Sequence, residues 1–408
     1  MELIQITEKD LIHLFETFGK MSENKKTTEN YEKVMQNCIN LWSIDNEFIT
    51  IENDKEDQLC ATYPSRILIP LGKNLPDESR KQAKKLDKEK IRNLIETSRF
   101  ARCRKRFPIP FLYYNNKFFC RSSTVSTDQL MNEEQKKNNL LEKAINADVE
   151  LLEMFGVKSV LNFMLEKSRQ KGSDYSGGSE LTAPKKPYHH FHLIATPYPG
   201  VKFFINYKLN KSDAKGIHYK WENSRNDAEL MIPEPIKKLP SLIPISFDEY
   251  QKWEINLLSK NYLKMMLATL ICDDFKGGFL FHCLSGWDRT PQFVCLCRAS
   301  LWADGVIHKS LSPEQFLYFV VGYDWFLFNH QLAYRMEIHA EIFSYCFYFM
   351  QFIENDELSI FTLDPSIKRV DQNQRKEKLV ALREKFFELY HPVVDPLINF
   401  QKDVSKYL

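Results

Sequence analysis

The sequence of 408 residues lacks an excess of charge of either sign. Lysine and arginine number 56, aspartate and glutamate number 54, and the formal net charge at pH 7 is +2. Because a near-neutral chain exerts no long-range attraction on a polyanion, we expect no nucleic-acid partner. Any anionic ligand has to be bound by a local group of basic residues.

Paired C-x-x-C motifs are also missing, and with them the usual spacing of a zinc site. The nine cysteines are scattered along the chain and do not form the dense pattern of a disulfide-rich domain. This usage favours a reducing compartment.

Long apolar runs are absent as well. The most apolar stretch, residues 316–328, is too short to cross a bilayer and is interrupted by Asp324. Charged residues also interrupt the N-terminal segment, where a secretory signal would need an apolar core. The sequence therefore predicts a cytoplasmic protein without a transmembrane segment, one that meets membranes only from outside.

The residues that are present suffice for a large core, since 43% of them are hydrophobic and 13% aromatic. Residues 1–95 are charged and mixed, with two apolar runs, 48–51 and 66–71, that are typical of strands. We place a boundary near residue 95, between an N-terminal mixed region, 1–95, and a larger domain, 96–408. The sequence leaves open whether the two pack together.

Beyond residue 95, strand and helix patterns alternate. Residues 107–120 predict a hairpin that turns at Asn115-Asn116-Lys117, and residues 172–179 predict a loop with a linker-like Ser-Gly-Gly-Ser end. Short apolar runs and helical periodicities predict strands at 192–195, 201–205 and 277–281, and helices at 250–271, 292–304, 313–332, 338–354 and 376–390. This order predicts an α/β fold in which helices flank a central sheet that is mainly parallel or mixed.

One segment has the chemistry of a cysteine-dependent phosphatase: His282-Cys283-Leu284-Ser285-Gly286-Trp287-Asp288-Arg289-Thr290. It lies between an apolar strand and a helix, so the N–H groups of the loop and of the first helical turn converge on one point. Such a site favours both a bound phosphate and a thiolate. Cys283 is then the nucleophile, and the planar fork of Arg289 holds two phosphate oxygens.

The remaining loop residues complete the predicted substrate site, which comprises Leu284, Ser285, Gly286, Trp287 and Thr290. Gly286 lets the loop turn, and Thr290 can donate its hydroxyl to the thiolate. Trp287 is either a packing residue or a rim for a ring-shaped substrate. His282 either braces the loop or is a core histidine.

The leaving alkoxide needs a proton, for which Asp288 is the candidate inside the loop. Asp273 and Asp274 lie before the strand, about 20 Å away if the strand is extended. The alternative for Asp288 is a carboxylate that only orients Arg289.

Spacing by itself does not identify this motif, because Cys60 and Arg66 are also separated by five residues. That copy contains no glycine, and its Pro64 lacks an N–H that a phosphate cradle needs. We interpret it as accidental, since no buried strand leads into it.

The segment Cys283–Thr290 resembles the signature of the myotubularin family, in which Gly-Trp-Asp-Arg-Thr follows the nucleophile after two residues. The resemblance is strongest to the Jumpy branch, on residues 282–291, 301–305 and 323–328, and it extends over residues 95–355. Arg121-Ser122 is similar to an Arg-Ser pair near the start of the family's phosphatase domain. The resemblance implies a cysteine-phosphatase fold with the phosphate loop between strand and helix, and C-terminal helices.

This resemblance also implies the activity: removal of the 3-phosphate from phosphatidylinositol 3-phosphate and phosphatidylinositol 3,5-bisphosphate through a phosphocysteine, without metal or other cofactor. Cys283, Arg289 and Asp288 would be nucleophile, phosphate ligand and general acid. The expected partner is a phosphoinositide on an intracellular membrane. Ser285 stands where most active members of the family have an aspartate, a difference that bears on the pH profile and on water activation. The family's usual lipid-binding domain and coiled coil are not evident, so the oligomeric state is left open.

Two other functions fit the same loop, a protein tyrosine phosphatase and a catalytically silent phosphoinositide-binding scaffold. The loop contains no lysine, so a second phosphate on the lipid requires basic residues from elsewhere. The candidates, which can equally be solvated surface residues, are Arg102, Arg104, Lys105, Arg106, Lys185 and Lys186.

Overall fold

The computed structural model of the chain describes residues 5–20, 28–53, 58–72, 80–127, 139–166, 179–181, 183, 186–222, 227–232, 247–271, 277–363 and 374–394. The strands are β1 (Phe48–Glu52), β2 (Arg66–Pro70), β3 (Ile109–Tyr114), β4 (Lys117–Ser123), β5 (Val157–Asn162), β6 (His192–Ala195) and β7 (Gly278–Cys283). The α-helices are α1 (Glu8–Lys20), α2 (Glu29–Asp45), α3 (Lys88–Ser98), α5 (Leu140–Met154), α6 (Ile205–Leu209), α8 (Ile255–Ile271), α9 (Arg289–Ala303), α10 (Pro313–Phe319), α11 (Leu332–Glu337), α12 (Ile342–Phe349), α13 (Ile360–Leu363) and α14 (Gln374–Val394). Most of the linker-like segment, as well as Asp273 and Asp274, lies outside the described residues.

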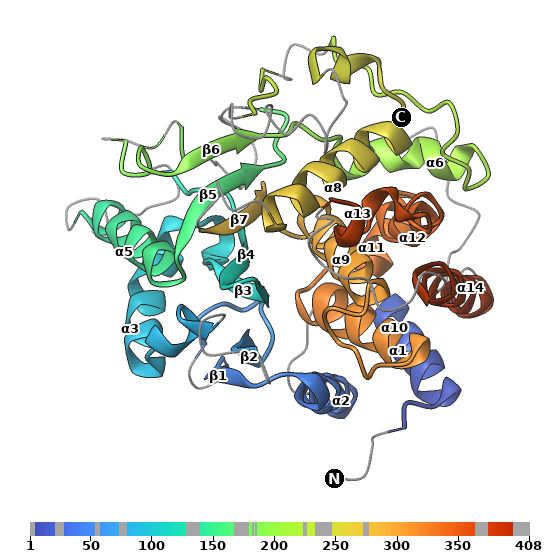
Figure 1. Cartoon of the computed structure of the whole chain (residues 1–408), viewed down its shortest axis with the longest axis horizontal. Helices are drawn as coiled ribbons and strands as arrows, with labels where there is room; N and C mark the ends of the chain where they lie inside the picture. Colours follow the sequence, from blue (N-terminus) through green and yellow to red (C-terminus); the bar gives the residue numbers. More distant parts are fainter. Residues whose placement is uncertain are drawn as a thin grey trace.

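Five strands form the central sheet, in the order β3-β4-β7-β5-β6. β4, β7, β5 and β6 run parallel, and β3 pairs with β4 as the antiparallel hairpin that the Asn115-Asn116 turn predicts. Figure 1 shows α3 and α5 on one side of this sheet and the helices from α8 onward on the other. The predicted α/β fold with a mixed, mainly parallel sheet flanked by helices is confirmed.

β7 lies at the centre of the sheet, between β4 and β5, and all six of its residues are buried. A central strand covered on both faces needs a continuous apolar run, which explains why the sequence reveals it. In open α/β sheets, ligands bind outside the carboxyl ends of the strands. Cys283 ends β7 at that edge.

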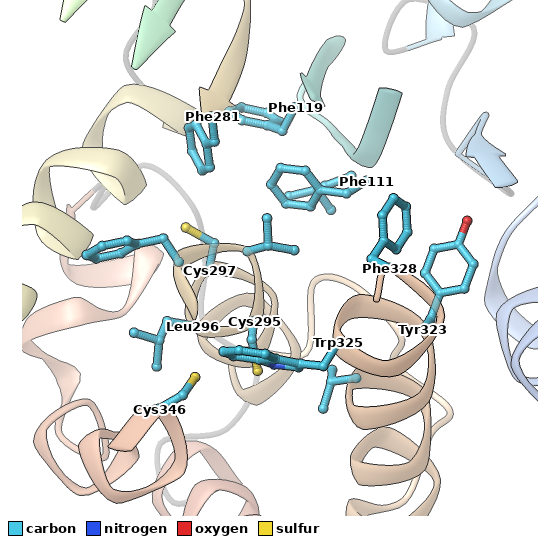
Figure 2. Close-up of a cluster of buried hydrophobic side chains, with 14 of the residues drawn as sticks. Phe111, Phe119, Phe281, Cys295, Leu296, Cys297, Tyr323, Trp325, Phe328 and Cys346 are labelled. Atoms are coloured by element: carbon cyan, nitrogen blue, oxygen red, sulfur yellow. The ribbon is translucent and has the colours of Figure 1, made fainter. Parts of the chain in front are cut away.

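α9 follows the phosphate loop and is buried along its whole length of 15 residues. Figure 2 shows Cys295, Leu296 and Cys297 of α9 among rings that include Phe281 of β7 and Trp325. Cys295 and Cys297 are 0% and 1% exposed, as expected for core positions. This helix, whose N-terminal end adjoins the loop, is therefore fixed by packing on all sides.

α10 continues directly into a π-helix, η8 (Val320–Leu327), where the sequence predicts one helix over 313–332. The buried carboxylate of Asp324 in η8 accepts hydrogen bonds from Arg298 Nε at 2.8 Å and Nη2 at 3.1 Å. This pairing compensates two charges that are removed from water. The change from α-type to π-type hydrogen bonding cannot be recognised from the spacing of apolar residues in the sequence.

The N-terminal helices α1 and α2 pack on the helical half of the molecule, whereas β2 packs on β3. Phe18 of α1 meets Phe326 of η8 with ring centroids 5.5 Å apart. β1 and β2 form a separate antiparallel pair, as the runs 48–51 and 66–71 predict. Buried apolar residues from both ends of the chain belong to one continuous core. The boundary placed near residue 95 falls inside α3, and the division of the chain into residues 1–95 and 96–408 stays a prediction.

The strand predicted for residues 201–205 is wrong. These residues form a 3₁₀ turn, Val201–Phe204, that leads into α6. Phe204 and Tyr207 are both buried, and they pack on Tyr345 with centroid distances of 4.9 and 5.6 Å. A spacing of three residues suits a helix, but a short apolar run does not distinguish helix from strand. The helix predicted for 338–354 is shorter, because only α12 and a 3₁₀ turn at Met350–Phe352 form there.

Candidate active site

Cys283 is 2% exposed at the end of β7. Its Sγ accepts hydrogen bonds from the Gly286 N–H at 3.3 Å and from the Thr290 hydroxyl at 3.2 Å. Donors from the loop and from the first turn of α9 stabilise negative charge on the sulfur. The structure thus brings together the proposed nucleophile and the two groups that the sequence selected to support it.

The loop after Cys283 can turn only because Gly286 adopts a left-handed conformation, with φ at +69°. A Cβ at this position would lie 2.6 Å from the carbonyl oxygen of Ser122 in β4. The loop therefore packs directly on the sheet through a residue without a side chain. Leu284 and Ser285 are half-buried in this loop.

Arg289 is the first residue of α9 and is 8% exposed. Its Nη1 donates to the carbonyl oxygens of Phe163 at 2.7 Å and Tyr198 at 3.1 Å. Nε and Nη2 bond to no other residue in the described part of the chain. A guanidinium fixed through one nitrogen retains donors for two phosphate oxygens, as the prediction for Arg289 requires.

Asp288 is buried, and its carboxylate is held by Arg335 of α11. Arg335 Nε donates to Oδ1 at 2.9 Å and Nη2 donates to Oδ2 at 3.0 Å, while His330 Nδ1 lies 3.1 Å from Oδ1. Burial raises the pKa of Asp288, but Arg335 and His330 outweigh it and hold that pKa well below its usual range. Within the described residues, the partner that Asp288 orients is Arg335 and not Arg289.

His282 belongs to a buried ionic network directly before the nucleophile. Its Nε2 lies 3.0 Å from Glu180 Oε2, and Glu180 Oε1 accepts from Arg102 Nη1 at 2.6 Å. Arg102 also pairs with Asp148 at 2.6 Å. Burial raises the pKa of Glu180, but His282 and Arg102 outweigh it and hold that pKa well below its usual range. The imidazole thus pairs with a carboxylate, which neither prediction for His282 included.

The basic residues predicted for a second phosphate separate into groups. Arg102 and Arg106 are each 1% exposed and bond to protein groups, so both predictions for them, ligands of a second phosphate or solvated surface residues, are wrong. Lys186 is exposed, and Lys185 lies outside the described residues. A run of basic residues in the sequence does not reveal which of them becomes buried between packed elements.

Arg104 and Lys105 lie between these two buried arginines, in the 3₁₀ turn Cys103–Lys105. Both have left-handed backbones, with φ values of 56° and 57°, and they are half-buried and exposed, respectively. The guanidinium carbon of Arg104 lies 4.1 Å from the centroid of the Trp287 ring. Trp287, half-buried in the loop, therefore has a cation stacked on its ring.

The second Cys-x5-Arg match has a structural role. Asn53 Nδ2 donates to the carbonyl oxygens of Cys60 at 2.9 Å and Pro64 at 2.8 Å, and its Oδ1 accepts from the Cys60 N–H at 3.0 Å. Arg66 pairs with Glu32 at 2.8 Å. Cys60 and Arg66 thus serve different contacts and form no anion cradle.

Several residues of the site were not selected from the sequence, because they are distant in the chain and have no local motif: Thr62, Phe163, Glu180, Tyr198, His330 and Arg335. In the part of the chain that the structure describes, no group of three or more His, Cys, Asp and Glu residues can hold a metal ion. None of the described helices is both long and apolar enough to cross a membrane.

A buried strand that ends in a cysteine, a glycine-containing loop that donates to its sulfur and a helix that begins with arginine define a cysteine-phosphatase fold. The chain is 32% identical to mouse "phosphatidylinositol-3,5-bisphosphate 3-phosphatase MTMR14" over 413 residues, which cover 93% of this chain and 63% of that protein. The human protein of the same name is 33% identical over 357 residues, covering 80% of this chain and 54% of its own length. These similarities confirm the resemblance to the myotubularin-related family, MTMR14 (Jumpy) branch, that the signature predicts.

A more distant relative has a name that gives the same activity. Mouse "phosphatidylinositol-3,5-bisphosphate 3-phosphatase MTMR2" is 24% identical over 296 residues, which cover 68% of this chain and 36% of that protein. No family model matches the chain. The chain thus spans between half and two thirds of the length of the MTMR14 proteins that it matches.

Proposed function

We propose that this chain is a phosphoinositide 3-phosphatase that hydrolyses the 3-phosphate of phosphatidylinositol 3-phosphate and phosphatidylinositol 3,5-bisphosphate. The observation that carries the proposal is the pair of hydrogen bonds from Gly286 and Thr290 to Cys283 Sγ, at the carboxyl edge of the sheet. The names of the MTMR14 relatives support this substrate class.

In the proposed reaction, the Cys283 thiolate attacks phosphorus in line with the 3-oxygen of the inositol ring. The S–P bond forms as the P–O bond to the ring breaks, and the leaving oxygen takes a proton from Asp288. Charge spreads over the three equatorial oxygens in the transition state, where Arg289 and the loop N–H groups donate. Water then attacks the phosphocysteine, which releases inorganic phosphate and restores the thiolate.

The ion pair of Asp288 with Arg335 constrains this mechanism. In the free protein Asp288 is a carboxylate, because its pKa lies below the usual range despite burial. The two negative charges of a bound phosphate oppose that ionisation and attract Arg335. We therefore assign the proton transfer to the enzyme–substrate complex, in which Asp288 binds a proton and donates it to the leaving group.

Selectivity for the second phosphate is assigned to the rim formed by Trp287, Arg104 and Lys105. The stacked guanidinium of Arg104 lies beside the loop, and its side chain is half-buried rather than fully solvated. The 3-phosphate would occupy the loop while the inositol ring lies against Trp287, so a 5-phosphate approaches the two cations. Action on a lipid further implies a protein that binds peripherally to the cytosolic face of an intracellular membrane.

Phosphate release from short-chain phosphatidylinositol 3-phosphate tests the proposal. Cys283→Ser should abolish release, while Cys297→Ala, which removes another buried thiol from the next helix, should retain it. Activity that survives in Cys283→Ser would contradict the assignment of the nucleophile. A higher kcat/KM on a phosphotyrosine peptide than on lipid would favour a protein phosphatase. The absence of a phosphocysteine burst would favour a silent scaffold.

A further inference from the structure

A buried guanidinium lies directly beneath the phosphate loop. Arg106 is 1% exposed, and its Nη2 donates to the carbonyl oxygen of Gly286 at 3.2 Å. Its Nε lies 3.4 Å from the position that a Cβ on Gly286 would occupy. The N–H of the same glycine donates to Cys283 Sγ at 3.3 Å. A single peptide residue thus connects Arg106 to the nucleophile.

Other contacts fix the guanidinium from below. Arg106 Nη1 donates to the Thr62 carbonyl at 2.9 Å, to the Thr62 hydroxyl at 2.8 Å and to the Phe328 carbonyl at 3.2 Å. The guanidinium carbon lies 4.6 Å from the centroid of the Tyr63 ring. Thr62 and Tyr63 lie in the N-terminal region, in the segment that Asn53 holds by hydrogen bonds to its backbone. Residues from before position 95 are therefore in contact with the support of the loop.

The charge of Arg106 has no carboxylate partner among the described residues. All of its hydrogen-bond acceptors are neutral oxygens, whereas the buried Arg102 and Arg298 pair with Asp148 and Asp324. A buried cation without a counter-ion is costly unless negative charge approaches it. Burial lowers the pKa of Arg106, and the acidic groups of Tyr63, Cys60 and Cys283 oppose that shift. A guanidinium stays protonated under these conditions.

We propose that Arg106 is a positioning residue of the phosphate loop, which holds Gly286 in place and supplies the buried positive charge that balances the Cys283 thiolate and the phosphocysteine. Thr62 fixes Arg106 for this task, so the segment around Thr62 is part of the catalytic unit. This inference rests on the proposed function.

Several other charged groups surround Cys283, and the test has to separate them from Arg106. They are His282, Asp288 and Arg289 of the loop, Glu180 behind His282, and Arg335, whose pKa the Cys283 thiol also influences. None of these groups bonds to Gly286 in the described residues.

The test is the rate of Cys283 alkylation by iodoacetamide as a function of pH in the full chain, with Cys283→Ser as the blank. In Arg106→Gln we expect the midpoint to move up by about one pH unit, because a cation near the sulfur is lost. We expect kcat on phosphatidylinositol 3-phosphate to fall at least about tenfold with a smaller change in KM, because the loop that meets the transition state is displaced. Arg106→Lys should restore part of the shift in midpoint and part of the loss in kcat. Arg66→Gln, which changes a surface arginine of the same region, should alter neither the midpoint nor kcat.

A folded Arg106→Gln variant with the parent alkylation profile and kcat would overturn the proposal. If that variant does not fold, Thr62→Val decides, since it removes one acceptor of Arg106 and keeps the carbonyl. An unchanged profile in Thr62→Val would then refute the inference, and an upward shift would support it. Alkylation needs no substrate, so a chain without lipid phosphatase activity would contradict the proposed function and still test Arg106.

Discussion

Gly286→Ala tests the geometry of the phosphate loop most directly. Gly286 has φ at +69°, a conformation that costs a residue with a Cβ about 1–2 kcal/mol. The new Cβ would lie 2.6 Å from the Ser122 carbonyl oxygen, which belongs to the backbone of β4 and cannot rotate away. The loop itself therefore has to move.

The size of that movement sets the expected loss. An ordinary contact begins at 3.4 Å, so the loop around Gly286 must retreat from Ser122 by several tenths of an ångström. The N–H that donates to Cys283 Sγ moves with it. Because a misplacement of about 1 Å can cost about 100-fold in rate, we expect kcat/KM to fall by one to two orders of magnitude. This corresponds to about 1.4–2.7 kcal/mol in the activation barrier.

The assay is phosphate release from phosphatidylinositol 3-phosphate together with urea unfolding. Gly305→Ala is the matched control, because Gly305 also has φ at +69° but its Cβ would meet only Gln374 Oε1 at 3.5 Å. Both variants should lose about 1–2 kcal/mol of unfolding free energy from backbone strain. Only Gly286→Ala should lose activity. Equal activity in the two variants would refute the argument from the close contact with β4.

Three further predictions concern charged residues of the site. Asp288→Asn should lower kcat on lipid by about 100-fold or more but have little effect on p-nitrophenyl phosphate, whose leaving group needs no proton; equal losses would contradict the role of general acid. Burial raises the pKa values of Asp288 and Glu180, but Arg335 and His330 at Asp288, and His282 and Arg102 at Glu180, outweigh it and lower them. Both carboxyls therefore stabilise the fold above the unfolded pKa of about 4, and this stability is lost as the pH falls through the folded pKa values. The unfolding free energy from urea titrations at pH 7, 5 and 3 should decline towards low pH, and Asp288→Asn should make that decline shallower. Arg104→Gln should lower kcat/KM on the 3,5-bisphosphate about tenfold relative to the monophosphate, and an unchanged ratio between the two lipids would exclude the rim as the second phosphate site.

The sequence predicts the strand, loop and helix around Cys283 because every part of that signal is local. An apolar strand, a cysteine, a glycine, an arginine and a helix follow one another within residues 278–303, and both hydrogen bonds to Cys283 Sγ come from within seven residues of it. The same local character explains why the hairpin at Asn115-Asn116 and the buried run of β7 were predicted correctly. Local periodicity fails where helix and strand patterns coincide, as at residues 201–205.

Only the tertiary structure decides which charges surround that loop. Within the basic run 102–106, Arg102 pairs with Asp148 and Arg106 bonds to Gly286, while Arg104 reaches the Trp287 rim. Likewise, the ion pair of Asp288 joins it to a residue 47 positions further along the chain. Burial and counter-ions depend on how distant elements pack, whereas the sequence by itself determines the strand, the loop and the cysteine that those charges surround.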